Sequence, residues 1–325
     1  MAESTIGPGR DHATLAAWEG LHQANLTGAG PELAHCYPYD DTTPCLIDGW
    51  TTTAADYIGV HMDSTARHAG VWDGDKWNLV VADDKAIGIY EEYVRVDGGQ
   101  LMIGSQTADG KWVVYVTGGA TSDVWLSNLI IRGSGNATYN TMGILVNVNI
   151  AVKIWNSIVY GIQTHDSDCL AAKFAGVVSI YSSVLIGGQV ALGVYTGTCV
   201  AKNVYCGRSS SEDFYRNAGT LDKHNCASED LSADDTGTGE TQDSCITGVA
   251  FGADTFVNVS AGTEDFHLAA DGLSPLQGVG EDTSGEGAPL NFTTDIDGDT
   301  RDATWDIGAD AWVVAISAIV KIINE

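Results

Sequence analysis

VWLSNLIIRG at residues 124–133 is followed by three segments that repeat its pattern: VKIWNSIVYG at 152–161, VSIYSSVLIG at 178–187 and TCVAKNVYCG at 198–207. Each segment ends in glycine, and these glycines are 28, 26 and 20 residues apart. Within the segments aliphatic residues recur at every second position, which is the period of a β-strand with one buried face. A repeat of this length with one such strand is typical of a solenoid, because one unit cannot bury its apolar face without a neighbour.

Aligning the segments on their final glycines divides them into columns. Alternate positions are expected to face a common core, and the positions between them should face solvent. In the column of Asn128, Asn156, Ser182 and Lys202, the two asparagines with Ser182 predict an internal ladder in which side-chain amides bond along the stack. The predicted core columns are Val124, Val152, Val178 and Thr198; Leu126, Ile154, Ile180 and Val200; and Ile130, Ile158, Val184 and Val204. The predicted outward positions are Leu129, Ser157, Ser183 and Asn203.

The sequence therefore predicts an all-β fold, a single-stranded parallel β-helix, preceded by a short N-terminal capping helix. Asp11 is the expected N-cap of that helix, and Leu15, Trp18 and Leu21 follow at helical spacing. Such a helix would cover the apolar end of the first turn.

The chain divides into three predicted regions. Residues 1–30 form an arm and the capping helix, and residues 31–270 form the β-helix. Within it, residues 208–245 are rich in Ser, Asp, Glu, Gly and Thr and are expected to be a surface excursion. Residues 271–325 are expected to supply closing rungs and an apolar tail.

The composition limits the classes of function. Among 325 residues, 43 are acidic and 15 basic, giving a formal net charge of -28. A surface this negative repels phosphates, so nucleic acid is not an expected partner. The N-terminus lacks the pattern of a secretory signal. The longest apolar run, Ala311 to Ile323, is too short to span a membrane.

The seven cysteines leave two alternatives open. None has the CxxC spacing of a metal site, so zinc is not expected on cysteines. Most are buried thiols, or some of the pairs close in sequence are disulfides. These pairs are Cys36/Cys45, Cys199/Cys206 and Cys226/Cys245.

One local cluster suits acid–base chemistry. His165, Asp166 and Asp168 follow the second segment at a bend, and two carboxylates with a histidine are the groups that cleave glycosidic bonds. The neighbouring turns offer no matching carboxylates, so a solvated polar turn is the competing interpretation.

A second pattern suits calcium. Asp295, Asp297 and Asp299 have the alternate spacing of a calcium loop, with Asp306 where such loops end in glutamate. The alternative is a structural turn in which Arg301 pairs with one of the aspartates. No other cofactor is expected.

Aromatic residues also allow two interpretations. Trp50, Trp72, Trp77, Tyr90 and Tyr93 can line a sugar-binding face or fill ladder and cap positions.

The repeats resemble the right-handed, pectate-lyase-like parallel β-helix. The stretch DFHLAADGLSPLQGVG at 265–280, followed by DIDGDTR at 295–301 and WDIGAD at 305–310, resembles the C-terminal end of choice-of-anchor Q β-helix proteins. The opening, RDHATLAAWEG at 10–20, is similar to proteins of bacteriophages and environmental viruses. The resemblance covers most of the chain and implies the fold more strongly than an activity. The acidic clusters of the polysaccharide hydrolases and lyases with this fold are not matched.

Three functional hypotheses follow. The first is a non-enzymatic virion structural protein on the particle surface, as capsid decoration, turret, fibre or spike, with host glycans as possible contacts. It would assemble as a homo-oligomer, a trimer by preference, and bind other virion proteins through its apolar tail. The second is a tailspike-type polysaccharide depolymerase or lyase. The third is an extracellular adhesin on a cell surface. The predicted interface residues are Trp312, Val313, Val314, Ile316, Ile319, Val320, Ile322 and Ile323.

Overall fold

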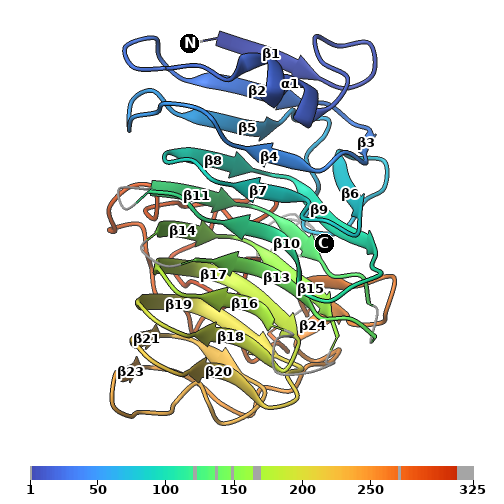
Figure 1. Cartoon of the computed structure of the whole chain (residues 1–325). Helices are drawn as coiled ribbons and strands as arrows, with labels where there is room; N and C mark the ends of the chain where they lie inside the picture. The colour runs from blue at the N-terminus through green and yellow to red at the C-terminus, as the bar shows by residue number, and fades with distance from the viewer. Residues whose placement is uncertain are drawn as a thin grey trace, which may run out of the picture.

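The computed structural model describes residues 2–119, 123–135, 138–147, 150–163, 170–269 and 272–312. The chain winds into a parallel β-helix in which each strand pairs with strands of the turns before and after it (Figure 1). The predicted stacking of the repeats is confirmed: Val124 pairs with Val152, and Val152 pairs with Val178. The fold therefore rests on the column pattern seen in the sequence.

Three runs of strands form the faces of the helix. The first face contains β1 (Ala2–Ile6), β2 (Glu32–Cys36), β5 (Ile58–Met62), β8 (Val94–Asp97), β11 (Asp123–Ser127), β14 (Ala151–Trp155), the first halves of β17 (Val177–Gly187) and β19 (Thr198–Gly207), β21 (Thr220–His224) and β23 (Glu240–Asp243). The second face contains β3 (Asp40–Asp41), β6 (Asn78–Ala82), β9 (Gln100–Ser105), β12 (Ile130–Arg132), β15 (Ile158–Ile162), the second halves of β17 and β19, and β22 (Ala227–Ser228). The third face is a seven-stranded sheet of β4 (Cys45–Ile47), β7 (Ile87–Ile89), β10 (Lys111–Val116), β13 (Thr141–Val146), β16 (Leu170–Phe174), β18 (Val190–Val194) and β20 (Glu212–Arg216).

A left-handed residue forms the corner between the first and second faces. Asn128, Asn156, Ser182, Asn203 and Asn225 all have φ between 44° and 55°. Asparagine adopts this conformation more readily than most residues because its short polar side chain bonds locally. The predicted amide ladder is present in part: Asn156 Nδ2 donates to Asn128 Oδ1 at 3.3 Å.

The corner reverses which side chains face inward, and this corrects part of the column assignment. Val124 and Leu126 face the core before the corner, but Leu129 and Ile131 face it afterwards. Ile130 instead belongs to a second apolar cluster on the outside of the helix. The predicted outward residues, Leu129, Ser157, Ser183 and Asn203, are all buried.

The fourth segment is shifted by one residue from its glycine alignment. Val178 pairs with Cys199, and Ile180 pairs with Ala201. Cys199 and Ala201 are therefore the core residues, and the predicted pair Thr198 and Val200 is half-buried. The glycine misaligns because Gly207 pairs with Ile186 and not with Gly187.

Residues 208–245 are turns of the helix, not a surface excursion. They contribute β20, β21, β22 and β23, each paired parallel with the preceding turn. The alternation of apolar residues is weak in residues 208–245 because Lys223 occupies a buried position beside Phe214 and Leu221. Its ammonium donates to the carbonyl oxygens of Ser232 and Asp235 and lies 3.5 Å from Glu240 Oε2, so the buried charge is paired and hydrogen-bonded.

The described part of residues 271–325 forms no closing rungs. It runs back along the outside of the second face, and Figure 1 shows this orange and red chain beside the middle strands. With the antiparallel pair β24 (Phe256–Asn258) and β25 (Asp265–Leu268), it covers the outer side chains Ile130, Ile158 and Val184. The prediction of closing rungs is wrong. Apolar residues that face an outer layer alternate along a strand in the same way as residues that face the core, so the sequence pattern does not distinguish the two.

The helix of the described residues is α1 (Leu15–His22). Its N-cap is Thr14, whose hydroxyl accepts a hydrogen bond from Ala17 N at 3.1 Å. The predicted N-cap Asp11 bonds Thr5 instead. Leu15 and Trp18 are buried as expected, whereas Leu21 is 75% exposed.

Two further expectations concern the cysteines and membranes. The six described cysteines are free thiols, all buried except the half-buried Cys245, so the thiol alternative holds for them. Cys226 and Cys245 nevertheless lie together, with Cys226 N donating to Cys245 Sγ at 3.4 Å.

Within the described ranges, no helix has the length and apolar character that crossing a bilayer requires.

The corner asparagines yield a stability test at Asn156. Asn156→Ala should lower the free energy of unfolding by about 2–4 kcal/mol, because it loses buried hydrogen bonds and strains a left-handed residue. Asn156→Gly should cost about 1–2 kcal/mol, since glycine accepts the positive φ and loses only the side-chain bonds. Urea unfolding of the two variants and the parent measures both. Equal losses, or no loss, would contradict this role of the corner.

Candidate functional site

The predicted catalytic residues His165, Asp166 and Asp168 lie outside the described residues. The last described residue before them, Gln163, lines a pocket of about 260 Å³. Tyr160, Arg208, Phe251 and Glu264 also line it. Gln163 thus lies at the edge of a polar pocket with aromatic walls.

The structure does not gather the predicted calcium ligands. Asp295 Oδ1 accepts hydrogen bonds from the backbone N–H groups of Asp297 and Asp299 at 3.0 and 2.9 Å, and Oδ2 accepts from Ala311 N at 3.2 Å. Asp299 is exposed. The carboxylate of Asp295 therefore organises a turn, and calcium on these three residues stays a prediction.

Arg301 does not form the expected ion pair. It is 5% exposed, and its guanidinium donates to the carbonyl oxygens of Gly308, Ala309 and Asp310 and to Asn156 Oδ1. Arg301 thus holds the last described loop against the corner between the first two faces.

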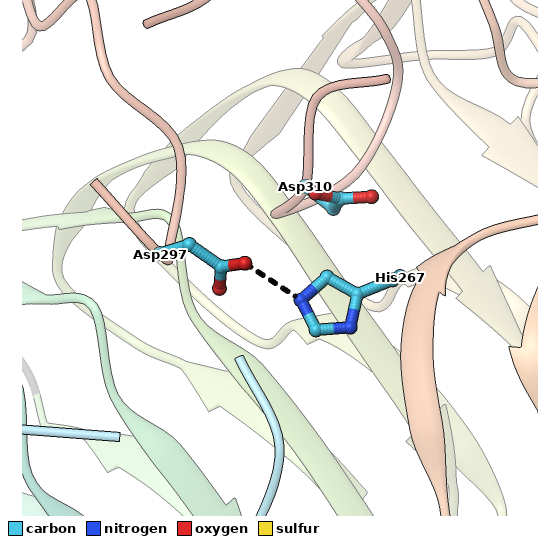
Figure 2. A group of neighbouring side chains, drawn as sticks. All are labelled: His267, Asp297 and Asp310. Carbon is cyan, nitrogen blue, oxygen red and sulfur yellow. Dashed lines mark hydrogen bonds and ion pairs between the residues drawn. The ribbon is translucent and has the colours of Figure 1, made fainter. Parts of the chain in front are cut away.

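A different group, which contains only Asp297 of the predicted metal ligands, lies beside this loop. His267 comes from β25, whereas Asp297 and Asp310 come from the C-terminal chain (Figure 2). One ligand-type atom from each residue lies within 4.8 Å of the others. His267 Nε2 is 2.9 Å from Asp297 Oδ2, and Nδ1 is 2.5 Å from Asp265 Oδ1. His267 is thus held between two carboxylates, with a third nearby.

The electrostatics of this group favour a protonated histidine when nothing else is bound. Burial acts to lower the pKa of His267, but its bonds to Asp265 and Asp297 raise that pKa to about 11. Burial raises the pKa of Asp310 to about 7. The carboxylate of Asp310 also accepts a hydrogen bond from Leu268 N at 2.8 Å, which ties β25 to the C-terminal chain.

The loop at residues 63–76 closes the group from a third direction. Gly70 has φ +66°, and a Cβ there would lie 2.4 Å from His267 Nε2 and 2.5 Å from Asp297 Oδ1. Asp297 Oδ1 is itself a buried oxygen without a hydrogen-bond partner in the structure. The members are 30 and 13 residues apart in the chain, from His267 to Asp297 to Asp310, so no local motif joins them.

The outer side of the third face carries half-buried aromatic residues, which we call the aromatic surface: Tyr90, Trp112, Tyr115, Tyr195 and Tyr215. Trp112 stacks on Tyr115 with ring centroids 4.9 Å apart, and Tyr115 contacts Tyr90 at 5.6 Å. Tyr195 and Tyr215 form a second pair at 5.9 Å.

A pocket of about 500 Å³ lies on this face. Trp112, Met142 and Leu145 supply apolar walls, while Asn147 and Lys173 supply polar groups. Of the five aromatics predicted for sugar binding, Tyr90 belongs to this surface, Trp72 lines another pocket, Trp50 and Trp77 are buried in the core, and Tyr93 is half-buried directly before β8.

Of the predicted interface residues, Trp312 is described and the other seven lie outside the described residues. Trp312 packs half-buried against the outer apolar cluster, and its N–H donates to Asp306 Oδ2 at 2.6 Å.

Two solved structures are similar to this chain. A pectate lyase, Pel9A, aligns over 93% of this chain and 92% of its own, with a TM-score of 0.48 and 12% identity. The pectin methylesterase from Aspergillus niger aligns over 75% and 82%, with a TM-score of 0.37 and 10% identity. Neither likeness carries the fold assignment, which rests on the strand pairing.

No family model and no curated protein matches the chain. The resemblance to bacteriophage and choice-of-anchor Q proteins therefore stays a prediction.

Proposed function

We propose that this protein is a non-enzymatic structural protein displayed on a virion surface, and that its aromatic surface contacts glycans of the host. The aromatic surface carries the proposal. Rings that stack on each other at a half-exposed sheet face offer flat apolar contacts, and sugar rings present matching apolar C–H faces. A β-helix suits display because its turns share one continuous core.

The charge distribution indicates which glycans fit. A formal net charge of -28 repels polyanions, so an uncharged sugar chain meets the smallest electrostatic barrier. Polar groups stand close to the rings: Asn147 Nδ2 donates to Tyr115 Oη at 3.1 Å, and Lys173 Nζ lies 4.3 Å from the Tyr195 ring centroid. Such groups fix the orientation of a ligand that stacking alone leaves free to slide.

Trp112→Ala tests the aromatic surface. It should weaken binding to a neutral glycan, identified on a glycan array, by about 5- to 150-fold, because loss of one stacking ring costs about 1–3 kcal/mol. Isothermal titration measures the affinity. Trp125→Ala is the matched control, since Trp125 is a half-buried indole on the first face. Equal affinity of both variants for the glycan would contradict the assignment.

A second test concerns the predicted interface. Removing residues 313–325 should leave a folded protein that no longer forms trimers or enters particles, because the apolar tail is proposed to bind sister subunits and other virion proteins. Sedimentation gives the oligomeric state, and co-purification with virions gives incorporation. An unchanged oligomer would count against the tail as the interface. Recovery with cells rather than virions would favour the adhesin.

A depolymerase is the second candidate, favoured by the pocket at Gln163. Its walls combine Tyr160, Phe251, Arg208 and Glu264, and the chain from Gln163 leads directly to the predicted catalytic residues. If this candidate holds, incubation with polysaccharide releases reducing sugar, and Asp166→Asn abolishes the release without changing glycan affinity. A protein that binds glycan and releases no reducing ends supports the non-enzymatic proposal.

Two finer features of the fold belong to the proposal. Helix α1 is proposed to cap the first turn, supported by Leu15 and Trp18, which lie in the main core. A right-handed winding is proposed because parallel strands are nearly always connected with that hand.

A further inference from the structure

We propose that His267, Asp297 and Asp310 bind a divalent transition-metal ion of the zinc or manganese type. The ion would join the C-terminal chain to β25 under the loop at residues 63–76. This inference is independent of the proposed function, because none of its residues lies on the aromatic surface.

The spacing of the three residues suits one ion. A metal bonded at about 2.1 Å to nitrogen and oxygen ligands holds those atoms about 3–3.5 Å apart. His267 Nε2 and Asp297 Oδ2 are already 2.9 Å apart, and all three ligand atoms lie within 4.8 Å of one another. Asp310 is the more distant member of the group in Figure 2, and a small movement of its carboxylate would bring the third ligand into range.

The surroundings of His267 have the arrangement expected of a metal ligand. A ligating histidine usually gives its other ring N–H to a carboxylate, which fixes the tautomer and the ring orientation. Asp265 accepts from Nδ1 in this manner at 2.5 Å, so the lone pair of a neutral ring sits on Nε2. Nε2 then faces Asp297 and the space between the C-terminal chain and the loop.

An unpartnered oxygen points to a small ligand. Asp297 Oδ1 is buried and lacks a hydrogen-bond partner, which is costly for a carboxylate oxygen unless something binds it. Gly70 packs directly against the group: a Cβ there would lie 2.4 Å from Nε2 and 2.5 Å from that oxygen, so a side chain at position 70 would collide with both residues.

The donor set selects the class of ion. Calcium prefers six to eight oxygen ligands, whereas imidazole nitrogen suits zinc and other transition metals, and carboxylates suit manganese as well. One imidazole with two carboxylates therefore favours zinc or manganese over calcium. On binding, the proton between Nε2 and Asp297 passes to solvent and the Nε2 lone pair bonds the ion.

Metal titration of the full chain tests the site. Protein stripped with a chelator should bind one equivalent of Zn²⁺ or Mn²⁺ with a Kd in the micromolar range or tighter. His267→Gln should weaken this binding at least about tenfold, in line with losses at other metal sites. Asp299→Asn and His35→Gln are matched controls, because Asp299 is an exposed carboxylate of the same turn and His35 a half-buried histidine of β2, and neither belongs to the group; both variants should bind as the parent does.

Three results would each overturn the metal site. Absence of a one-equivalent site, unchanged affinity in His267→Gln, or binding of Ca²⁺ alone would each exclude it. If His267→Gln fails to fold by circular dichroism, electron spin echo spectra of Mn²⁺ bound to the parent protein decide. A nitrogen coupling supports an imidazole ligand at the site, and its absence rejects it.

Discussion

From β11 onward the structure depends on a left-handed residue at the corner between the first and second faces. A positive φ at Asn128, Asn156 or Asn203 turns the chain within one residue, so two strands of one turn can follow each other closely. The same conformation lets the asparagine side chains point away from the core. One backbone choice therefore sets both the cross-section of the helix and a line of amide groups along its edge.

That line of amides is where the C-terminal chain attaches. Asn156 Nδ2 donates to Thr294 O, Asn203 Nδ2 donates to Glu281 O, and Asn225 Nδ2 donates to Val279 O, each at 2.8 Å. These hydrogen bonds run from side-chain amides to backbone carbonyls, so at these points the C-terminal chain is attached without pairing as a strand. The outer apolar residues of the second face are buried by this attachment, which removes an exposed patch that would otherwise promote aggregation.

The sequence predicted the stacking of turns because alternation and repeat length are local properties. It did not predict the reversal at each corner, since Leu129 and Ile130 are both aliphatic and only the φ of Asn128 decides which one faces inward. It also missed the turns beyond residue 207, where Lys223 takes a buried position through bonds to carbonyl oxygens. The group at His267 was out of reach because three separate segments meet there, and no spacing rule links them.

Buried hydrogen bonds hold the last described residues in place. Arg301 binds four acceptors around Gly308–Asp310 and the Asn156 corner, and Asp306 accepts hydrogen bonds from Gly278 N and Trp312 N. Breaking these bonds while the groups stay buried would leave the guanidinium and its acceptors unpaired at a high cost in free energy, so they hold this loop firmly against the Asn156 corner. Trp312, the last described residue, is therefore coupled to the β-helix through this loop and the Asn156 corner.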